Sequence, residues 1–361
     1  MIVTFSLVLF SYVPVSGTAW TPPPPEAMRW GNAVLRQPAA WYSSAEARAM
    51  ANAVLEYQSP NGAWPKNTDL TKTPVTPGIL AEIERTGSAD TIDNGATTTP
   101  MRFLAQVFDA GGDTRYREAF DRGLDYLFKA QYENGGWPQF FPLRKGYYSH
   151  ITFNDDAMVN VLSLLRDVGE GKAPFSFVNE ARKGQAREAV RRGIDVILRT
   201  QIKRDGKLTA WCAQYDEKSL EPAWARAYEL PSLSGNESVG ITRFLMEVDP
   251  PTPEIVSAVE GAIAWLRASA IPGIRLEEFT GIDGKRDRRV VADPSAPLIW
   301  ARFYELGANR PVFLGRDSVV RYALSEIEHE RRNGYAYYGA WPANLLEKDY
   351  PRWRAKHSLR N

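Results

Sequence analysis

The stretch Gln131-Tyr132-Glu133-Asn134-Gly135-Gly136-Trp137-Pro138-Gln139 follows one helical pattern and precedes the next. A similar arrangement occurs at 58–67, and fainter ones occur at 201–211 and 328–341. The first three lie about 70 residues apart, which leaves room for two helices and their loops. A repeat of this length predicts a fold built from stacked helical units.

Apolar residues recur at helical spacing between these stretches, while the alternation typical of strands is weak. We therefore predict an all-α fold of helical hairpins that stack into a toroid, with no major sheet. Long loops at one end are expected to form an open cleft. The predicted helices span 43–58, 101–110, 113–128, 155–168, 179–200, 237–248, 253–269, 296–306 and 318–330.

The bulk composition of the 361 residues is that of a globular protein, with 44% hydrophobic and 24% charged residues. A formal net charge of +1 and the absence of a basic domain argue against nucleic-acid binding. The single cysteine, Cys212, rules out an intrachain disulfide framework.

The N-terminal region has its own pattern. An apolar run at 3–15 is followed by Ser16-Gly17-Thr18-Ala19, which is typical of a secretory signal peptide. The run is too short for a confident membrane span. We expect a signal peptide at 1–19, a linker or N-terminal extension at 20–42 and one catalytic domain at 43–361, in a secreted or periplasmic protein without a membrane anchor.

Four polar clusters fall in register with the repeat, each before the first predicted helix of a pair. They are Asp93-Asn94, Asn154-Asp155-Asp156, Asn236-Glu237-Ser238 and Asp293-Pro294-Ser295. One such cluster alone is most simply a helix N-cap. Four at one end of a toroid make a candidate site, and their oxygen atoms suit a hard cation or sugar hydroxyls.

Eight sequence blocks resemble the family-ten pectate lyases, in the order of that family and over most of the chain after residue 42. The blocks are 62–67, 91–103, 134–139, 152–157, 224–232, 301–304, 315–317 and 331–335. The resemblance implies an incomplete (α/α)3-type toroid that binds calcium. It also implies cleavage of α-1,4-linked polygalacturonate by anti β-elimination, which gives 4,5-unsaturated oligogalacturonides.

The resemblance also implies roles for single residues. Asp155 is expected to be the principal calcium ligand, with Asp93 as a second ligand, and Arg226 is expected to be the base that removes the C5 proton. The residues expected to bind substrate are Asn94, Arg302, Arg316 and Tyr148. Arginine is a poor base because it is almost always protonated, so the protonation state of Arg226 is left open.

Each of these residues also has a purely structural interpretation. Asp155 could be a helix cap, and Asp156 is expected either to cap the helix or to support Asp155. Arg302 could pair with Glu305 on a helix surface, and Arg316 could pair with the neighbouring Asp317. Arg226 could be a solvated loop residue.

Several other residues were considered for the site. The spacing of His150, His329 and His357 matches no zinc motif, so we leave them out of the chemistry. The tryptophans of the repeat, Trp64, Trp137 and Trp341, are expected to be structural. Lys66, Tyr147 and Tyr148 could line the cleft or lie outside it.

Two other functions remain open on the sequence. A glycoside hydrolase on a similar toroid could use Asp93 and Asp155 as its two carboxylates. A non-catalytic pectin-binding protein could keep the calcium site and lack the base. The expected partner is polygalacturonate or pectin, and the protein is expected to be a monomer.

Overall fold

The computed structural model describes residues 29–73 and 75–358. The predicted signal peptide and the segment Pro22–Pro25 lie outside the described residues. Within the described part of the chain, no helix is both long and apolar enough to cross a membrane.

The helices predicted between 43 and 269 are present in the predicted order, and two helices, at 77–86 and 350–356, are additional to the prediction. The main helices are α1 (Ala45–Glu56), α2 (Pro77–Thr86), α3 (Thr98–Gly111), α4 (Thr114–Ala130), α5 (Ala157–Gly169), α6 (Glu180–Thr200), α7 (Glu237–Met246), α8 (Pro253–Ala268), α9 (His329–Gly334) and α10 (Tyr350–Lys356). Shorter helical turns are η1 (Asn32–Arg36), η2 (Ala39–Ser43), η3 (Asp93–Gly95), η4 (Tyr147–Ser149), η5 (Asn154–Asp156), η6 (Phe175–Phe177), η7 (Leu324–Glu326) and η8 (Leu345–Asp349).

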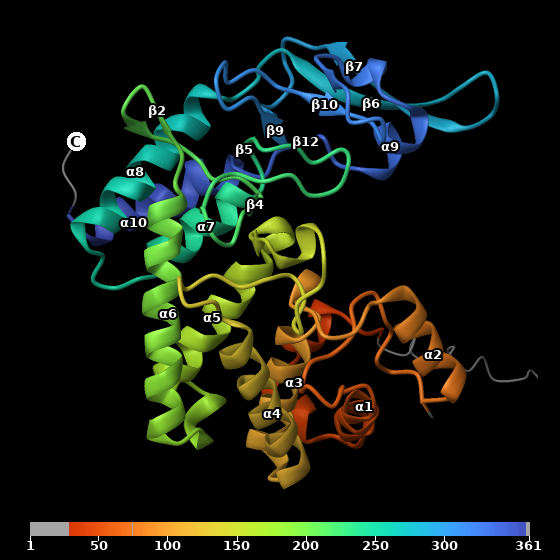
Figure 1. The fold of residues 1–361 in the computed structure, drawn as a ribbon, viewed down its shortest axis with the longest axis vertical. Helices are drawn as coiled ribbons and strands as arrows, with labels where there is room; N and C mark the ends of the chain where they lie inside the picture. The colour runs from red at the N-terminus through yellow and green to blue at the C-terminus, as the bar shows by residue number, and fades with distance from the viewer. Residues whose placement is uncertain (1–28, 74, 359–361) are drawn as a thin grey trace, which may run out of the picture.

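Three helical hairpins form the body of the molecule: α3 with α4, α5 with α6, and α7 with α8 (Figure 1). The inner helices α3, α5 and α7 contact one another in turn, and so do the outer helices α4, α6 and α8. This arrangement confirms the predicted all-α toroid of stacked hairpins. One hydrophobic core runs through it, from Val34 to Trp353.

A tryptophan in each unit forms a hydrogen bond with the outer helix that precedes it in the sequence. Trp64, Trp137, Trp211 and Trp300 are fully buried or nearly so. Their indole N–H groups donate, at 2.7–2.8 Å, to the carbonyl oxygens of Val54, Leu127, Ile197 and Leu266, near the ends of α1, α4, α6 and α8. The predicted structural role of Trp64 and Trp137 is confirmed, but Trp300 takes the fourth position instead of Trp341.

The glutamines of the repeat tie each unit to the next. The side-chain amides of Gln58, Gln131 and Gln201 donate to the carbonyl oxygens of Ala119, Ala189 and Ala258, which lie on α4, α6 and α8. These bonds measure 2.8–2.9 Å. The repeated sequence therefore fixes both the fold within a unit and the stacking between units.

The fourth unit has no inner helix, so the helices predicted at 296–306 and 318–330 are wrong. Short strands replace the first: β8 (Trp300–Ala301) and β9 (Phe303–Tyr304). The second becomes β11 (Val320–Arg321), η7 and the start of α9. Short runs of aromatic and apolar residues do not distinguish a helix from a buried strand, and here pairing with distant segments decides.

Strands elsewhere form only two-stranded sheets in the described chain. The longest is the hairpin of β6 (Ile274–Thr280) and β7 (Arg286–Ala292), which lies at the end of the molecule away from α1 (Figure 1). Asp293 follows this hairpin in a turn and precedes no helix. The remaining strands are β1 (Ile151–Thr152), β2 (Lys203–Arg204), β3 (Lys207–Leu208), β4 (Gln214–Tyr215), β5 (Leu233–Ser234), β10 (Phe313–Leu314) and β12 (Tyr338–Gly339).

The described part of the predicted N-terminal extension, 29–42, is folded against this body. Its turns η1 and η2 contact α3, and Val34 is fully buried. This part of the segment therefore belongs to the wall of the domain.

Candidate active site

The polar clusters before the inner helices do not cap them. The outer helices α1, α4, α6 and α8 each begin at a capping residue whose side chain accepts a hydrogen bond from a backbone N–H of the helix. These capping residues are Ser44, Asp113, Asn179 and Thr252. The inner helices α3, α5 and α7 have no side-chain cap bond. The capping interpretation of Asp155 and Asp156 is therefore wrong, and the carboxylate of Asp155 is directed to other partners.

Each cluster is held by the unit that follows it. The backbone amides of Ile92, Asn154 and Gly235 donate hydrogen bonds to the backbone carbonyl oxygens of Gln139, Ala213 and Arg302, in that order, at 2.9–3.2 Å. Polar residues from successive units are thereby brought into one row at the end of the toroid.

Asn94 and Asp155 occupy equivalent positions in their units. Both lie in the left-handed region, with φ of 53° and 51°. This conformation is costly for most residues with a side chain, and Asn and Asp tolerate it best. Asp93 is therefore the structural counterpart of Asn154, which explains why it points inward while Asp155 is more exposed.

Asp93 is buried beside a lysine. Its Oδ2 atom accepts hydrogen bonds from Lys66 Nζ at 2.6 Å and from Gln139 Nε2 at 2.8 Å. Its Oδ1 atom is buried and has no hydrogen-bond partner in the described structure. Buried carboxylate oxygens are nearly always engaged, so this oxygen is available for a ligand.

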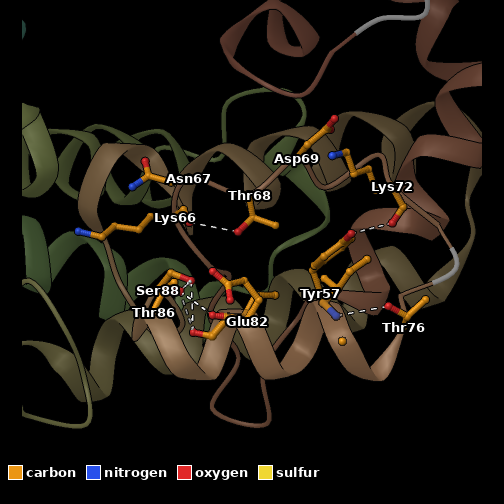
Figure 2. A pocket seen from close by; sticks show the side chains of 13 residues that line it. Tyr57, Lys66, Asn67, Thr68, Asp69, Lys72, Thr76, Glu82, Thr86 and Ser88 are labelled. Atoms are coloured by element: carbon orange, nitrogen blue, oxygen red, sulfur yellow. Dashed lines mark hydrogen bonds between the residues drawn. The ribbon is translucent and has the colours of Figure 1, made fainter.

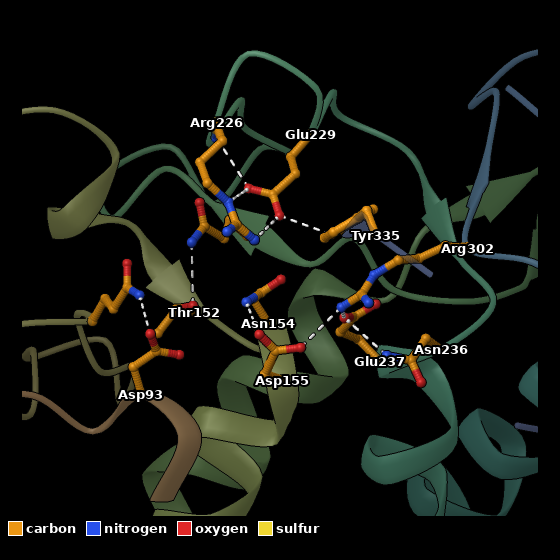
Figure 3. A network of polar contacts seen from close by, with 12 residues as sticks. Asp93, Thr152, Asn154, Asp155, Arg226, Glu229, Asn236, Glu237, Arg302 and Tyr335 are labelled. Atoms are coloured by element: carbon orange, nitrogen blue, oxygen red, sulfur yellow. Dashed lines mark hydrogen bonds and ion pairs between the residues drawn. The ribbon is translucent and has the colours of Figure 1, made fainter. Parts of the chain in front are cut away.

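Asp155 is linked to Arg302 and Glu237 (Figure 3). Arg302 donates to Asp155 Oδ1 at 3.0 Å and also to Glu237 Oε1. The side chain of Glu237 is fully buried and that of Arg302 is 7% exposed, whereas that of Asp155 is 38% exposed. Arg302 thus neutralises a buried carboxylate and orients an accessible one.

Asp156, the next residue, lies against α7. A Cβ atom at Gly240 would come within 2.0 Å of its Oδ1 atom, so this close approach requires glycine. Loss of hydration, followed by the charges of Glu237 and Asp155, raises the pKa of Asp156 to about 6.

Arg226 is held by Glu229, and Figure 3 shows this pair above Asp155. Its Nε atom donates to Glu229 Oε2 at 2.8 Å, and Tyr335 donates to Glu229 Oε1 at 2.8 Å. Burial acts to lower the pKa of Arg226, but the hydrogen bond and charge of Glu229 outweigh it and the pKa lies above its ordinary value. In this arrangement Arg226 is a cation.

The three predicted arginines are connected by two tyrosines. The ring of Tyr335 lies 4.8 Å from the guanidinium carbon of Arg302 and 5.7 Å from that of Arg226. Tyr228 lies 5.0 Å from Arg226 and 5.8 Å from Arg316. Arg226 and Arg302 are therefore close neighbours, and Arg316 lies further out on the same aromatic row.

The structural pairs suggested for two of these arginines are not formed. Arg316 pairs with Glu330 at 3.0 Å, and Asp317 pairs with Arg321. Arg302 is not on a helix, and Glu305 pairs with Arg310.

The comparison with known families assigns the chain to one of them. The sequence model described as pectic acid lyase matches residues 58–346. The chain belongs to this family. No curated protein sequence matches it.

Two solved structures resemble this pectic acid lyase family member closely. One is a family 10 polysaccharide lyase from Cellvibrio cellulosa, with 35% identity, a TM-score of 0.75, and coverage of 91% of this chain and 94% of that one. The other is an aspartate-to-alanine mutant of a family 10 polysaccharide lyase from the same organism, in complex with trigalacturonic acid. It has the same identity and TM-score and covers 88% of this chain and 95% of that one.

Tyr147 and Tyr148 of the family member lie on η4, next to Phe140. The ring of Tyr148 packs edge-on against Phe140, whose ring also lies 5.2 Å from Lys66 Nζ. Burial, then Tyr148, raises the pKa of Tyr147, and Arg226 and Glu229 are among the charges that act on it. Both tyrosines therefore lie between Asp93 and Arg226.

A second group of possible ligands lies outside the predicted calcium site. One ligand atom each of His150, Asp216 and Glu217 lies within 4.8 Å of the others. Asp216 is already engaged with the backbone amides of Lys218 and Ser219. Calcium prefers oxygen ligands throughout, so this histidine-containing group does not match a calcium site.

Sequence reasoning missed four residues of the site: Gln139, Glu229, Glu237 and Tyr335. Glu237 was in a recognised cluster, and the other three lie inside blocks that resemble the family. The available signal was therefore the block, because nothing in the local pattern shows that a distant arginine will meet each side chain.

Proposed function

We propose that this protein is a calcium-dependent pectate lyase that cleaves α-1,4-linked polygalacturonate by anti β-elimination and leaves a 4,5-unsaturated sugar. The observation that carries the proposal is the group of Asp93, Asp155 and Arg226, in which one buried and one partly exposed carboxylate accompany a fixed cation (Figure 3). Membership of the pectic acid lyase family supports it, as does the relative whose structure holds trigalacturonic acid.

Asp93 and Asp155 have the chemistry of calcium ligands. Asp155 offers a partly exposed carboxylate as principal ligand, and Asp93 supports it with a buried oxygen that has no other partner. These are hard oxygen ligands of the kind that calcium prefers. When bound, the ion supplies positive charge to the carboxylate of the sugar being cleaved, which increases the acidity of its C5 proton.

Four further side chains are assigned to substrate binding in this proposal. Arg302 orients Asp155, and its buried Nε atom, which has no hydrogen-bond partner in the described structure, is free to donate to substrate. Arg316, exposed at the end of the row, binds a uronate carboxylate further along the polymer. Asn94 and Tyr148 contact sugar hydroxyls beside Asp93.

Arg226 is the base for C5 in this proposal. Because Glu229 keeps it charged, removal of the C5 proton requires that the guanidinium first release Glu229 and lose a proton to solvent when substrate binds. Tyr335 can retain Glu229 while Arg226 turns towards the sugar.

The two alternative functions differ from the lyase in measurable ways. A hydrolase needs one carboxylic acid that donates a proton, whereas Asp93 and Asp155 both accept hydrogen bonds from cationic side chains. A binding module needs no base.

The decisive assay uses polygalacturonate with calcium and follows ultraviolet absorbance together with new reducing ends. The lyase raises both, and a chelator abolishes both. New reducing ends without absorbance would show a hydrolase, and binding without either product would show a binding module.

The proposal also covers the cellular location and the oligomeric state of the enzyme. We place the enzyme outside the cytoplasm, secreted or periplasmic, because its substrate is a polymer too large to enter the cell, and we assign it a monomeric state. Fractionation of expressing cells and light scattering of the purified protein test these two statements.

A further inference from the structure

A cavity of about 360 Å³ lies beside Asp93, at the N-terminal end of the row of units. Three segments form it: the chain before η1, the loop after Trp64, and the turn before α3. Its lining residues are Arg29, Trp30, Gly31, Asn32, Pro65, Lys66, Asn67, Thr68, Asp69, Asn94, Gly95, Ala96 and Thr99.

The cavity continues the candidate active site. Asn94 directly follows Asp93, and Lys66 lines the cavity while its Nζ atom bonds Asp93. The units that carry Glu237, Asp155 and Asp93 succeed one another through the contacts of α7, α5 and α3. Because the N-terminal turns η1 and η2 pack on α3, the cavity is the next position beyond Asp93 in that row.

The lining has the chemistry of a site for an acidic sugar. Arg29 is exposed and forms no ion pair with any residue that the structure describes, so its guanidinium is available for a carboxylate. Asn32, Asn67 and Asn94 offer amides that can bind hydroxyl groups. Trp30 is held edge-on by Phe103, with ring centroids 5.8 Å apart, and gives the wall a flat aromatic surface.

Asp69 is the one carboxylate in the lining, and its negative charge should repel a bound uronate only weakly. Asp69 Oδ1 accepts hydrogen bonds from the backbone amide and the hydroxyl of Thr71, at 3.1 and 2.7 Å. These bonds offset part of its charge, and they lower its pKa although burial acts to raise it.

A second cavity, of about 580 Å³, shares the loop residues Lys66, Asn67, Thr68 and Asp69 with the first (Figure 2). Its far wall is α2, which contributes Ile79, Ile83 and Glu82. This wall carries no guanidinium, and Glu82 is already paired with Arg85 at 2.7 Å. The cavity is therefore a poorer match for a uronate.

We propose that the cavity bounded by Arg29 and Trp30 is a further subsite for one uronate residue of an extended polymer, with Arg29 as the residue that recognises its carboxylate. This inference rests on the proposed function. Arg29 and Trp30 lie outside the residues 58–346 that the family sequence model matches.

The test compares kcat/KM for a galacturonate trimer, a galacturonate hexamer and polygalacturonate. Arg29→Ala should lower kcat/KM on the hexamer and the polymer by about tenfold, the loss expected for one charge-assisted contact. Turnover of the trimer should change less than about twofold, because a short substrate is held by the central contacts.

Two matched variants control for charge and position. Arg36→Ala removes an exposed arginine from the same segment but outside the cavity, and Lys72→Ala removes a cation from the cavity of Figure 2. Neither should affect the dependence on chain length. Equal losses for Arg29→Ala and Arg36→Ala, a trimer loss as large as the hexamer loss, or a chain-length effect from Lys72→Ala alone would overturn the proposal.

Failure of the subsite is distinguishable from failure of the proposed function. If the wild-type protein produces no unsaturated product with calcium, the lyase proposal fails. Calorimetric binding of the galacturonate hexamer then tests the subsite alone: weaker binding to Arg29→Ala than to Arg36→Ala supports it, and equal binding refutes it.

Discussion

Asp93 is the residue whose replacement best separates ligand binding from structural support. Asp93→Ala should lower kcat/KM by roughly 10–100-fold, as for residues that support a metal site. It should also cost about 1–3 kcal/mol of stability, because Lys66 and Gln139 lose a buried acceptor. Steady-state assays and thermal melts measure the two effects. Asp93→Asn is the control, since it keeps an acceptor and should restore stability without restoring activity; full activity per folded molecule in either variant would make Asp93 purely structural.

Replacement of Arg302 should affect stability more strongly than replacement of Asp93, because Arg302 compensates the buried charge of Glu237. Arg302→Met leaves that carboxylate without its partner, and we expect a loss of about 3–5 kcal/mol in denaturant unfolding. The double variant Arg302→Met/Glu237→Gln should recover most of the stability while remaining inactive, since Asp155 stays unoriented. Recovery of activity with stability would show that Arg302 only supports the fold.

The role of Arg226 is tested through Glu229. A base must be deprotonated, so activity should rise with pH as the guanidinium loses its proton. Glu229 raises the pKa of Arg226, and Glu229→Gln should therefore lower that pKa and move the rising part of the kcat profile to lower pH. Tyr335→Phe removes one hydrogen bond to Glu229 but keeps its charge, so it should shift the profile much less. An unshifted profile in Glu229→Gln would leave Arg226 with an electrostatic role alone.

At the scale of elements, the tryptophans of the repeat should affect stability and not chemistry. Trp211→Phe removes an indole donor that meets the Ile197 carbonyl oxygen at 2.8 Å and leaves that buried oxygen with only the longer hydrogen bond from the Thr200 hydroxyl, at 3.3 Å. We expect a loss of about 1–3 kcal/mol in the free energy of unfolding, with unchanged kcat/KM per folded molecule. Trp224→Phe, at an exposed position, should cost far less; similar losses for both would refute the fastening role of Trp211.

The sequence predicts elements well where they are long and periodic. Helices α3 to α8 lie close to their predicted bounds because their apolar stripes face a single core. The segment around Arg302 was predicted as a helix because its apolar residues are equally compatible with one. In the structure its backbone instead pairs with Ser234 and Tyr337, which lie more than 30 residues away. No local pattern contains that information.

The candidate site shows the same limit. The clusters at Asp93, Asp155 and Glu237 are visible in the sequence because they recur with the repeat. Their different orientations are not visible, since they depend on which residue of each cluster adopts the left-handed conformation. The contact between Arg302 and Glu237 joins residues 65 positions apart, and only the stacking of units brings them together.

At the scale of the whole molecule, the core and the proposed calcium site are separate. The hydrophobic core extends through all the hairpins, whereas the carboxylates lie at the ends of the inner helices. Removal of calcium should therefore abolish activity and leave the fold intact. Circular dichroism after chelation should be unchanged while turnover on polygalacturonate is lost, and calcium should restore that turnover. Unfolding on chelation would show that the ion is structural instead.

Calcium should in turn raise the melting temperature of the whole domain by binding only the folded state. At a calcium concentration about 100 times its Kd the gain is about 2.7 kcal/mol. Asp155→Ala should remove this shift because it loses the principal ligand, and Asp156→Asn should keep it because that carboxyl faces Gly240 on α7. Magnesium should give a smaller shift than calcium, since it requires a tighter octahedral arrangement of ligands and retains more of its water. If Asp155→Ala kept the full calcium-induced shift, the ion would be bound elsewhere and Asp155 would lose its assigned role as the principal ligand.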